Sequence, residues 1–123
     1  MNGYCVGKEE RPWGRFELLL DEPGYKVKRV TVEPGKRLSL QLHHHRLEHW
    51  HIVLGEGLAT VGDRETAVRA GQSIDIPSNV QHRMENAAPV PLVFVEVQRG
   101  SKLVESDIVR LQDDYGRCGS VSC

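Results

Sequence analysis

The organisation of this chain is best read from Gly35–Gly55, which has the sequence GKRLSLQLHHHRLEHWHIVLG. Leucines alternate with polar residues in its first half, which predicts a strand over Leu38–His43 whose successive side chains point to opposite faces. Gln41 and His43 then share one face. Leu38, Leu40 and Leu42 point to the other face. A buried polar row needs a partner, because an unpaired polar group costs a few kcal/mol.

A metal ion is a suitable partner for this polar row. After a turn, Glu48 is expected to begin the next strand and return a carboxylate to Gln41 and His43, and His82 supplies a second imidazole. Two imidazoles, a carboxylate and an amide oxygen suit zinc, iron(II), manganese, nickel or cobalt better than calcium. The lack of thiolates favours a catalytic or substrate-binding site over a structural one. The alternative for the three consecutive histidines is a solvated surface turn.

Short apolar or alternating runs separated by Gly, Pro, Asp and Asn recur along the chain. The predicted strands are Phe16–Leu20, Tyr25–Val32, Leu38–His43, His49–Leu54, Gly57–Val61, Glu65–Val68, Ser73–Ile76, His82–Asn86 and Leu92–Arg99. Asp107–Leu111 fits either a short strand or a helical turn. Many short strands with turn residues between them predict an all-β sandwich or barrel.

The length of 123 residues predicts one domain, over residues 11–117, with flexible tails at 1–10 and 118–123. A net charge of −1 gives no reason to expect a nucleic-acid or membrane partner. The N-terminus lacks the layout of a signal peptide, and no apolar run reaches the roughly 18–20 residues of a membrane span, so we expect a cytoplasmic protein. Three terminal cysteines, Cys5, Cys118 and Cys123, do not predict a disulfide framework.

Two blocks of this sequence resemble the motifs of the cupin superfamily. The positions that match are Gly35, Gln41, His43, Glu48 and Gly55 in the first block, and Gly71, Pro77, Asn79, His82 and Asn86 in the second. Gln41 stands where the general motif has a histidine, and Asn79 stands where it has a glycine. Asparagine tolerates left-handed backbone angles, so we expect Asn79 to keep the same turn.

The longer string from Gln41 to Trp50, QLHHHRLEHW, is similar to a narrower family, the type II mannose-6-phosphate isomerase cupin domain. That domain forms the C-terminal part of bifunctional mannose-1-phosphate guanylyltransferase/mannose-6-phosphate isomerase enzymes, and it uses a glutamine at the Gln41 position. The resemblance covers Arg11–Arg117 and implies an all-β jelly-roll barrel, the cupin double-stranded β-helix, in a single domain. No Gly-rich nucleotide loop is present, so guanylyltransferase activity is not expected.

The resemblance implies interconversion of mannose 6-phosphate and fructose 6-phosphate through an enediol. One divalent metal ion would be held by Gln41, His43, Glu48 and His82, with zinc the leading candidate ahead of manganese, nickel, cobalt and iron. A base must move the proton. His45 and Glu96 are the candidates for this catalytic role, with His51 a further possibility.

The phosphate of such a substrate needs cations. The candidate substrate-binding residues are Arg46, beside the ligand loop, Arg110, in the C-terminal motif, and Lys28. Pairing of an N-terminal edge strand predicts a homodimer. Two alternatives to the isomerase stay open, a non-catalytic metal-containing sugar-binding cupin and an iron-dependent cupin oxygenase.

Overall fold

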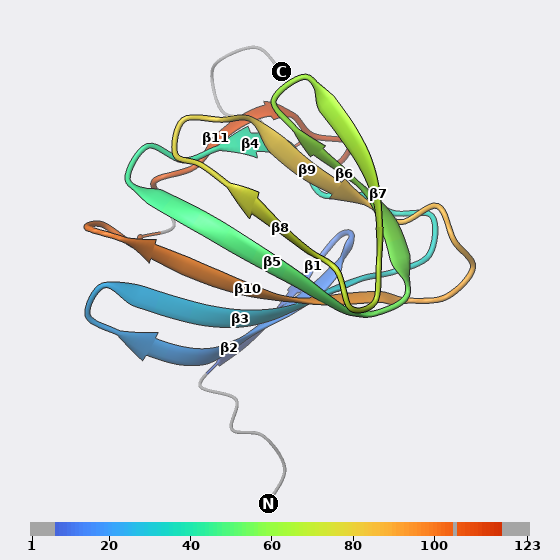
Figure 1. The fold of residues 1–123 in the computed structure, drawn as a ribbon, viewed down its shortest axis with the longest axis horizontal. Coiled ribbons are helices and arrows are strands. Elements are labelled where there is room, and N and C mark those ends of the chain that lie inside the picture. The colour runs from blue at the N-terminus through green and yellow to red at the C-terminus, as the bar shows by residue number, and fades with distance from the viewer. Residues whose placement is uncertain (1–6, 105, 117–123) are drawn as a thin grey trace, which may run out of the picture.

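The fold consists of two antiparallel β-sheets that face each other (Figure 1). It was obtained as a computed structural model, which describes residues 7–104 and 106–116. Every element in these ranges is a strand, so the predicted all-β architecture is confirmed. The described residues form no helix that could cross a lipid bilayer. The three cysteines, and the tail residues 1–6 and 118–123, lie outside the described ranges.

The larger sheet has six strands in the order β1-β2-β3-β10-β5-β8. Their bounds are Gly7–Arg11 (β1), Gly14–Glu22 (β2), Tyr25–Val32 (β3), Leu92–Gly100 (β10), Arg46–Leu54 (β5) and Ser73–Ile76 (β8). Lys28 of β3, Glu96 of β10 and Trp50 of β5 lie directly opposite one another across three adjacent strands. Directly opposed residues share a face, so this row points into the space between the sheets.

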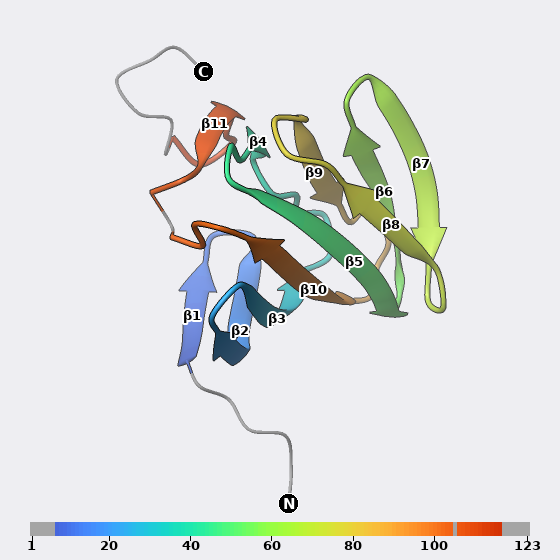
Figure 2. The same ribbon diagram turned by 60° about the vertical axis from the view of Figure 1, so that its left-hand side comes forward.

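The smaller sheet has five strands in the order β11-β4-β9-β6-β7. Their bounds are Val109–Gln112 (β11), Leu40–Leu42 (β4), His82–Glu85 (β9), Glu56–Val61 (β6) and Arg64–Arg69 (β7). A second row runs across it, in which Gln41 of β4 lies opposite both Arg110 of β11 and His82 of β9. Figure 2 shows β11 beside β4, next to the turn that leads into β5.

All nine predicted strands are present, and the strand alternative for Asp107–Leu111 is confirmed by β11. Two predicted boundaries need correction. The N-terminal tail was expected to extend to residue 10, but residues 7–10 belong to β1, which pairs with β2 along its whole length. The strand expected to start at Glu48 starts at Arg46, because its first residues pair with the end of β10.

Apolar side chains fill the space between the sheets at the end away from the polar rows. The core residues with no exposed surface are Val32, Ile52, Ala59, Met84, Leu92 and Phe94. Leu38, expected on the outer face with Leu40, is 7% exposed and belongs to this core. The reason is that Leu38 precedes β4, so the alternation of an extended strand does not extend to it.

The turns use residues that tolerate a left-handed backbone. The motif glycines Gly35, Gly55 and Gly71 have φ angles of 77°, 83° and 94°. Asn79 has a φ of 64°, so the expectation that it holds a left-handed turn is confirmed. Its side-chain oxygen also lies 2.7 Å from Nδ1 of His44, which links this turn to the histidine segment.

Candidate metal centre and cavity

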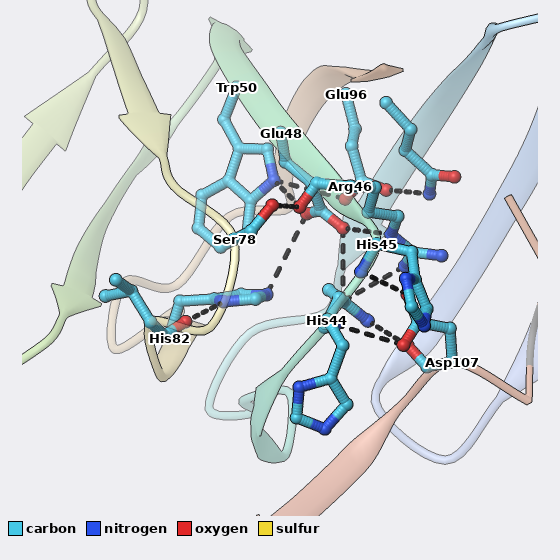
Figure 3. Close-up of polar contacts among 12 residues, drawn as sticks. His44, His45, Arg46, Glu48, Trp50, Ser78, His82, Glu96 and Asp107 are labelled. Carbon is cyan, nitrogen blue, oxygen red and sulfur yellow. Dashed lines mark hydrogen bonds and ion pairs between the residues drawn. The ribbon is translucent and has the colours of Figure 1, made fainter. Parts of the chain in front are cut away.

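Three of the four predicted metal ligands form one buried cluster. Donor atoms of His43, Glu48 and His82 all lie within 4.8 Å of one another, so the group could hold a metal ion. Nε2 of His43 is 3.1 Å from one carboxylate oxygen of Glu48, and Nε2 of His82 is 3.8 Å from the other. Figure 3 shows the contact between Glu48 and His82, with the ring of His44 turned away from Glu48.

The hydrogen bonds of both imidazoles leave Nε2 as the atom that faces Glu48. Nδ1 of His43 donates to the carbonyl oxygen of Asp107 at 2.7 Å, and Nδ1 of His82 donates to the carbonyl of Val80 at 3.0 Å. A backbone carbonyl can only accept, so the ring proton lies on Nδ1 and the lone pair on Nε2. Metal-bound histidines are oriented in this way by a second partner.

His82 is the clearest indication that the cluster suits a cation. Its Nε2 is buried and has no hydrogen-bond partner among the residues that the structure describes. Burial lowers the pKa of His82, which favours the neutral imidazole that binds metals. A buried acceptor without a partner is costly, and a divalent ion beside the carboxylate of Glu48 would satisfy it.

Gln41 is placed where a fourth ligand would be expected. It lies opposite His82 on the neighbouring strand, and directly opposed side chains have their Cβ atoms about 4.5–5.5 Å apart. It also lines the same cavity as His43 and Glu48. The amide can therefore offer a neutral oxygen to an ion held by the other three residues.

Arg46 lies inside the cluster, where it binds two of the candidate ligands. Its Nε donates to Glu48 Oε2 at 3.0 Å, and its Nη2 donates to His43 Nε2 at 3.0 Å. Burial would raise the pKa of Glu48, but the surrounding imidazoles of His43 and His82 and the guanidinium of Arg46 hold that pKa below its usual value. Glu48 is therefore a carboxylate at neutral pH.

A cavity of about 390 Å³ opens beside the cluster. Both sheets contribute to its walls, with His43 and Gln41 on one side and Trp50 and Glu96 on the other. The indole Nε1 of Trp50 lies 3.0 Å from Glu48 and 3.1 Å from Glu96, so one N–H group bridges the two carboxylates. Its ring packs against the core residue Phe94 at a centroid distance of 5.0 Å.

Glu96 is the second carboxyl group of the cavity, and it differs from Glu48 in its charge. It is 8% exposed, and its other oxygen accepts a hydrogen bond from Gln98. Burial, reinforced by the nearby charge of Glu48, raises the pKa of Glu96 to about 7, although Lys28 opposes the shift. Two carboxyl groups with separated pKa values in one cavity are typical of acid–base sites.

The remaining predicted site residues fall into two groups. Lys28 and Arg110, two of the candidate substrate-binding residues, line the cavity. His45 is exposed and is not among the described residues that line the cavity. His51, the further candidate, binds Ser73 on the outer side of β5, with its Nδ1 2.6 Å from Oγ. Of the candidate bases, the structure brings Glu96 to the metal cluster and leaves both histidines away from it.

Two residues of the site were missed by sequence reasoning. Arg11 lines the cavity from the end of β1. Asp107 uses its carbonyl to orient His43, and its carboxylate accepts hydrogen bonds from the backbone amides of His44 and His45 at 3.0 and 2.9 Å. Burial would raise the pKa of Asp107, but the two amides outweigh it and lower that pKa. The Asp-Ile-Val-Arg string that contains Asp107 was the available signal.

Comparison with solved structures identifies the fold. A conserved protein with a double-stranded β-helix domain from Klebsiella pneumoniae matches with a TM-score of 0.68 and 21% identity, covering 76% of this chain and 80% of that chain. The capsular polysaccharide assembling protein CapF from Staphylococcus aureus matches with a TM-score of 0.78 and 20% identity, covering 89% of this chain and 35% of that chain. The fold is the double-stranded β-helix of the cupins.

Sequence comparison narrows the class to one family. The model described as "Mannose-6-phosphate isomerase C-terminal" matches residues 5–113, and the chain belongs to this family. A mannose-1-phosphate guanylyltransferase from Klebsiella pneumoniae is 45% identical over 108 residues, and the xanthan biosynthesis protein XanB from Xanthomonas campestris is 48% identical over 110. These matches cover 88% and 89% of this chain but only 23% and 24% of the relatives, so the chain spans about a quarter of their length.

Proposed function

We propose that this cupin is a metal-dependent sugar-phosphate isomerase that interconverts mannose 6-phosphate and fructose 6-phosphate. The observation that carries the proposal is the indole N–H of Trp50, which contacts both Glu48 of the metal cluster and Glu96. A candidate base and the metal donors are therefore neighbours in one cavity. Membership of the mannose-6-phosphate isomerase C-terminal family supports the same function.

The metal end of the site would use His43, Glu48, His82 and Gln41 as ligands. Zinc is the leading candidate, and manganese, nickel, cobalt and iron suit the same nitrogen and oxygen donors. A bound divalent ion supplies polarisation of the sugar carbonyl. Trp50 closes one wall, and its position against the core keeps Glu48 and Glu96 in a fixed relation.

Glu96 is assigned the proton transfer. In the forward direction its carboxylate takes the proton from C2 of open-chain mannose 6-phosphate while O1 is protonated, which gives the enediol. Loss of the proton from O2 and return of the carbon-bound proton to C1 then complete fructose 6-phosphate, with no net redox change. Burial, the main cause of the raised pKa of Glu96, suits this task, because a general base works best with a pKa close to the operating pH.

The cations are divided between the two ends of the substrate. Arg46 already binds Glu48 and His43, so we assign it to the carbonyl end of the sugar. Lys28 and Arg110 are assigned to the rest of the substrate. Guanylyl transfer is not included, because the sequence has no Gly-rich nucleotide loop. A cytoplasmic location and a homodimer formed through the edge strand β1 complete the proposal.

The test measures turnover and proton exchange on protein of known metal content. The protein is loaded separately with Zn²⁺, Mn²⁺, Ni²⁺, Co²⁺ and Fe²⁺, and a coupled assay follows mannose 6-phosphate to fructose 6-phosphate. NMR in deuterated water reports deuterium at C2 of mannose 6-phosphate. We expect turnover and exchange with at least one ion, and loss of both in Glu96→Gln without loss of metal. Glu17→Gln, on the outer face of β2, is the matched control.

The outcomes separate the alternatives. Metal-loaded protein that shows neither turnover nor deuterium exchange with any of the ions would overturn the isomerase. Binding of mannose 6-phosphate without either reaction would instead support the sugar-binding module. Turnover that persists in Glu96→Gln would retain the isomerase and remove Glu96 from the role of base.

A further inference from the structure

The cavity carries an excess of positive charge that the metal centre does not explain. The charged side chains that line it are Arg11, Lys28, Arg46, Arg110, Glu48 and Glu96. Four cations thus face two carboxyl groups, whereas the whole chain has a net charge of −1. A local excess of this kind inside a concave site concentrates anions.

Two of these cations gather on one aromatic ring at the β1–β3 side of the cavity. Nζ of Lys28 lies 4.3 Å from the ring centroid of Phe16, and the guanidinium carbon of Arg11 lies 4.9 Å from it. Phe16 attracts both cations through its π face but carries no negative charge to neutralise them. The ring therefore holds two like charges at one side of the cavity, where both can contact a bound dianion.

The backbone holds this pair in place. Lys28 is 8% exposed and projects from the middle of β3. Arg11 ends β1, and its guanidinium donates to Glu9 Oε1 at 2.8 Å and to the carbonyl of Glu10 at 2.9 Å. Both side chains start from paired strands, so their separation is set by the sheet and not by a loop.

The pair lies at the opposite side of the cavity from the metal cluster. Lys28 on β3 is opposite Glu96 on β10, which is opposite Trp50 on β5. Adjacent strands are about 4.8 Å apart, so β3 and β5 are separated by roughly 10 Å. Glu96 thus stands between the two cations and the strand that supplies Glu48. A ligand with an anionic group at one end and a carbonyl at the other would contact Glu96 with its middle.

From this arrangement we infer that Lys28 and Arg11 form the subsite for the phosphate dianion of a small phosphorylated sugar, with Phe16 as its floor. The inference rests on the proposed function and adds to it a residue, Arg11, that determines specificity for phosphorylated over free sugars. Arginine binds a phosphate with two parallel hydrogen bonds, and lysine contributes a point charge.

Calorimetry on the metal-loaded full chain tests this subsite with three probes, mannose 6-phosphate, mannose and inorganic phosphate. The variants are Arg11→Gln and Lys28→Met, the second an uncharged side chain of similar length that leaves the buried position filled. Arg15→Gln removes one positive charge from the outer face of β2 and is the control. Metal content and thermal unfolding are measured for all four proteins.

We expect each site variant to bind mannose 6-phosphate and inorganic phosphate about 10- to 100-fold more weakly than wild type, as for loss of a charge-assisted hydrogen bond. In both site variants the affinity for mannose and the metal content should equal those of wild type. Arg15→Gln should bind all three probes as wild type does. If the affinities for mannose and mannose 6-phosphate fell equally, or if neither affinity fell, the subsite would be overturned. Phosphate binding that depends on Arg11 and Lys28 in a protein without isomerase turnover would keep the subsite and reject only the proposed function.

Discussion

The backbone carbonyl of Asp107 accepts a 2.7 Å hydrogen bond from Nδ1 of His43, and this contact fixes which nitrogen of the imidazole faces Glu48. The Asp107 carboxylate also accepts hydrogen bonds from the backbone amides of His44 and His45. One residue from the segment before β11 therefore sets both the tautomer of a candidate metal ligand and the shape of the turn that carries it.

Replacement of Asp107 should weaken metal binding although Asp107 is not a ligand. In Asp107→Ala the amides of His44 and His45 lose their acceptor, so the turn and the carbonyl beneath His43 shift. We expect affinity for Zn²⁺ and Mn²⁺ to fall about 10- to 100-fold, the range for loss of an outer partner of a metal ligand. Competition with a chelator of known affinity measures it.

Asp114→Ala provides the control for this prediction. Asp114 lies in the same C-terminal segment, but it binds Arg37 through two hydrogen bonds of 2.6 and 2.9 Å away from the cavity. Its loss should leave metal affinity unchanged. Equal metal affinity in Asp107→Ala and Asp114→Ala would show that the contact with His43 does not orient the ligand.

Gln41→Ala tests whether the amide is a metal ligand. We expect its metal affinity to fall by at least about tenfold, the lower end of what even outer partners cost, and to stay above that of His43→Ala. Gln72→Ala, which removes an exposed glutamine at the turn between β7 and β8, is the control. Wild-type affinity in Gln41→Ala would mean that two imidazoles and one carboxylate hold the ion without the amide.

Glu96 should make the stability of the metal-free protein depend on pH. Its pKa is raised to about 7 in the fold, against an ordinary value of 4.5, so the folded state keeps a proton that the unfolded state has lost between these values. The free energy of unfolding should therefore fall as pH rises from 4.5 to 7, by about 3 kcal/mol from this group.

Chemical denaturation of wild type and Glu96→Gln across this pH range measures the difference. The variant should lack the decrease, because its amide does not titrate. The amide of Gln98 can turn over to accept from the new side chain, since its Oε1 has no hydrogen-bond partner within the described residues. Parallel curves for the two proteins would contradict a raised pKa. Glu56→Gln, on β6, controls for the change in charge.

Gly100 should not tolerate a side chain. A Cβ atom there would lie 2.2 Å from the carbonyl oxygen of His45 and 2.8 Å from Cα of Arg46. Both atoms belong to the backbone, so the turn itself would have to move. We expect Gly100→Ala to lower the free energy of unfolding by about 1–3 kcal/mol, as for other overpacked sites. In Gly7→Ala, where nothing lies within 4 Å, stability should stay close to wild type in the same denaturation experiment.

The strands that sequence reasoning found are those whose own pattern encodes burial on one face. β5 and β10 alternate in this way over most of their nine residues. β1 does not, because GKEER has no apolar alternation and becomes a strand through pairing with β2. At Leu38 the prediction was wrong for another reason. The alternation of side chains holds within β4, but it was extended to Leu38, which precedes the strand and is buried.

The site was predictable where its residues share one strand or one turn. Gln41 and His43 are two positions apart, so strand alternation puts them on one face, and the short turn that follows leads back to Glu48. Arg11 and Asp107 reach the site from far along the chain, and their positions depend on which strands become neighbours. The raised pKa of Glu96 likewise depends on burial next to Glu48, which no local pattern encodes.

The contact between Asp107 and His43 joins residues that are 64 positions apart. A ribosome releases the N-terminal part of a chain first, so His43, Glu48 and His82 are all translated before the residue that orients the first of them. A nascent chain that ends before Asp107 carries the three donors without the carbonyl that sets the tautomer of His43. The proposed metal site thus reaches its final geometry only after β11 has formed.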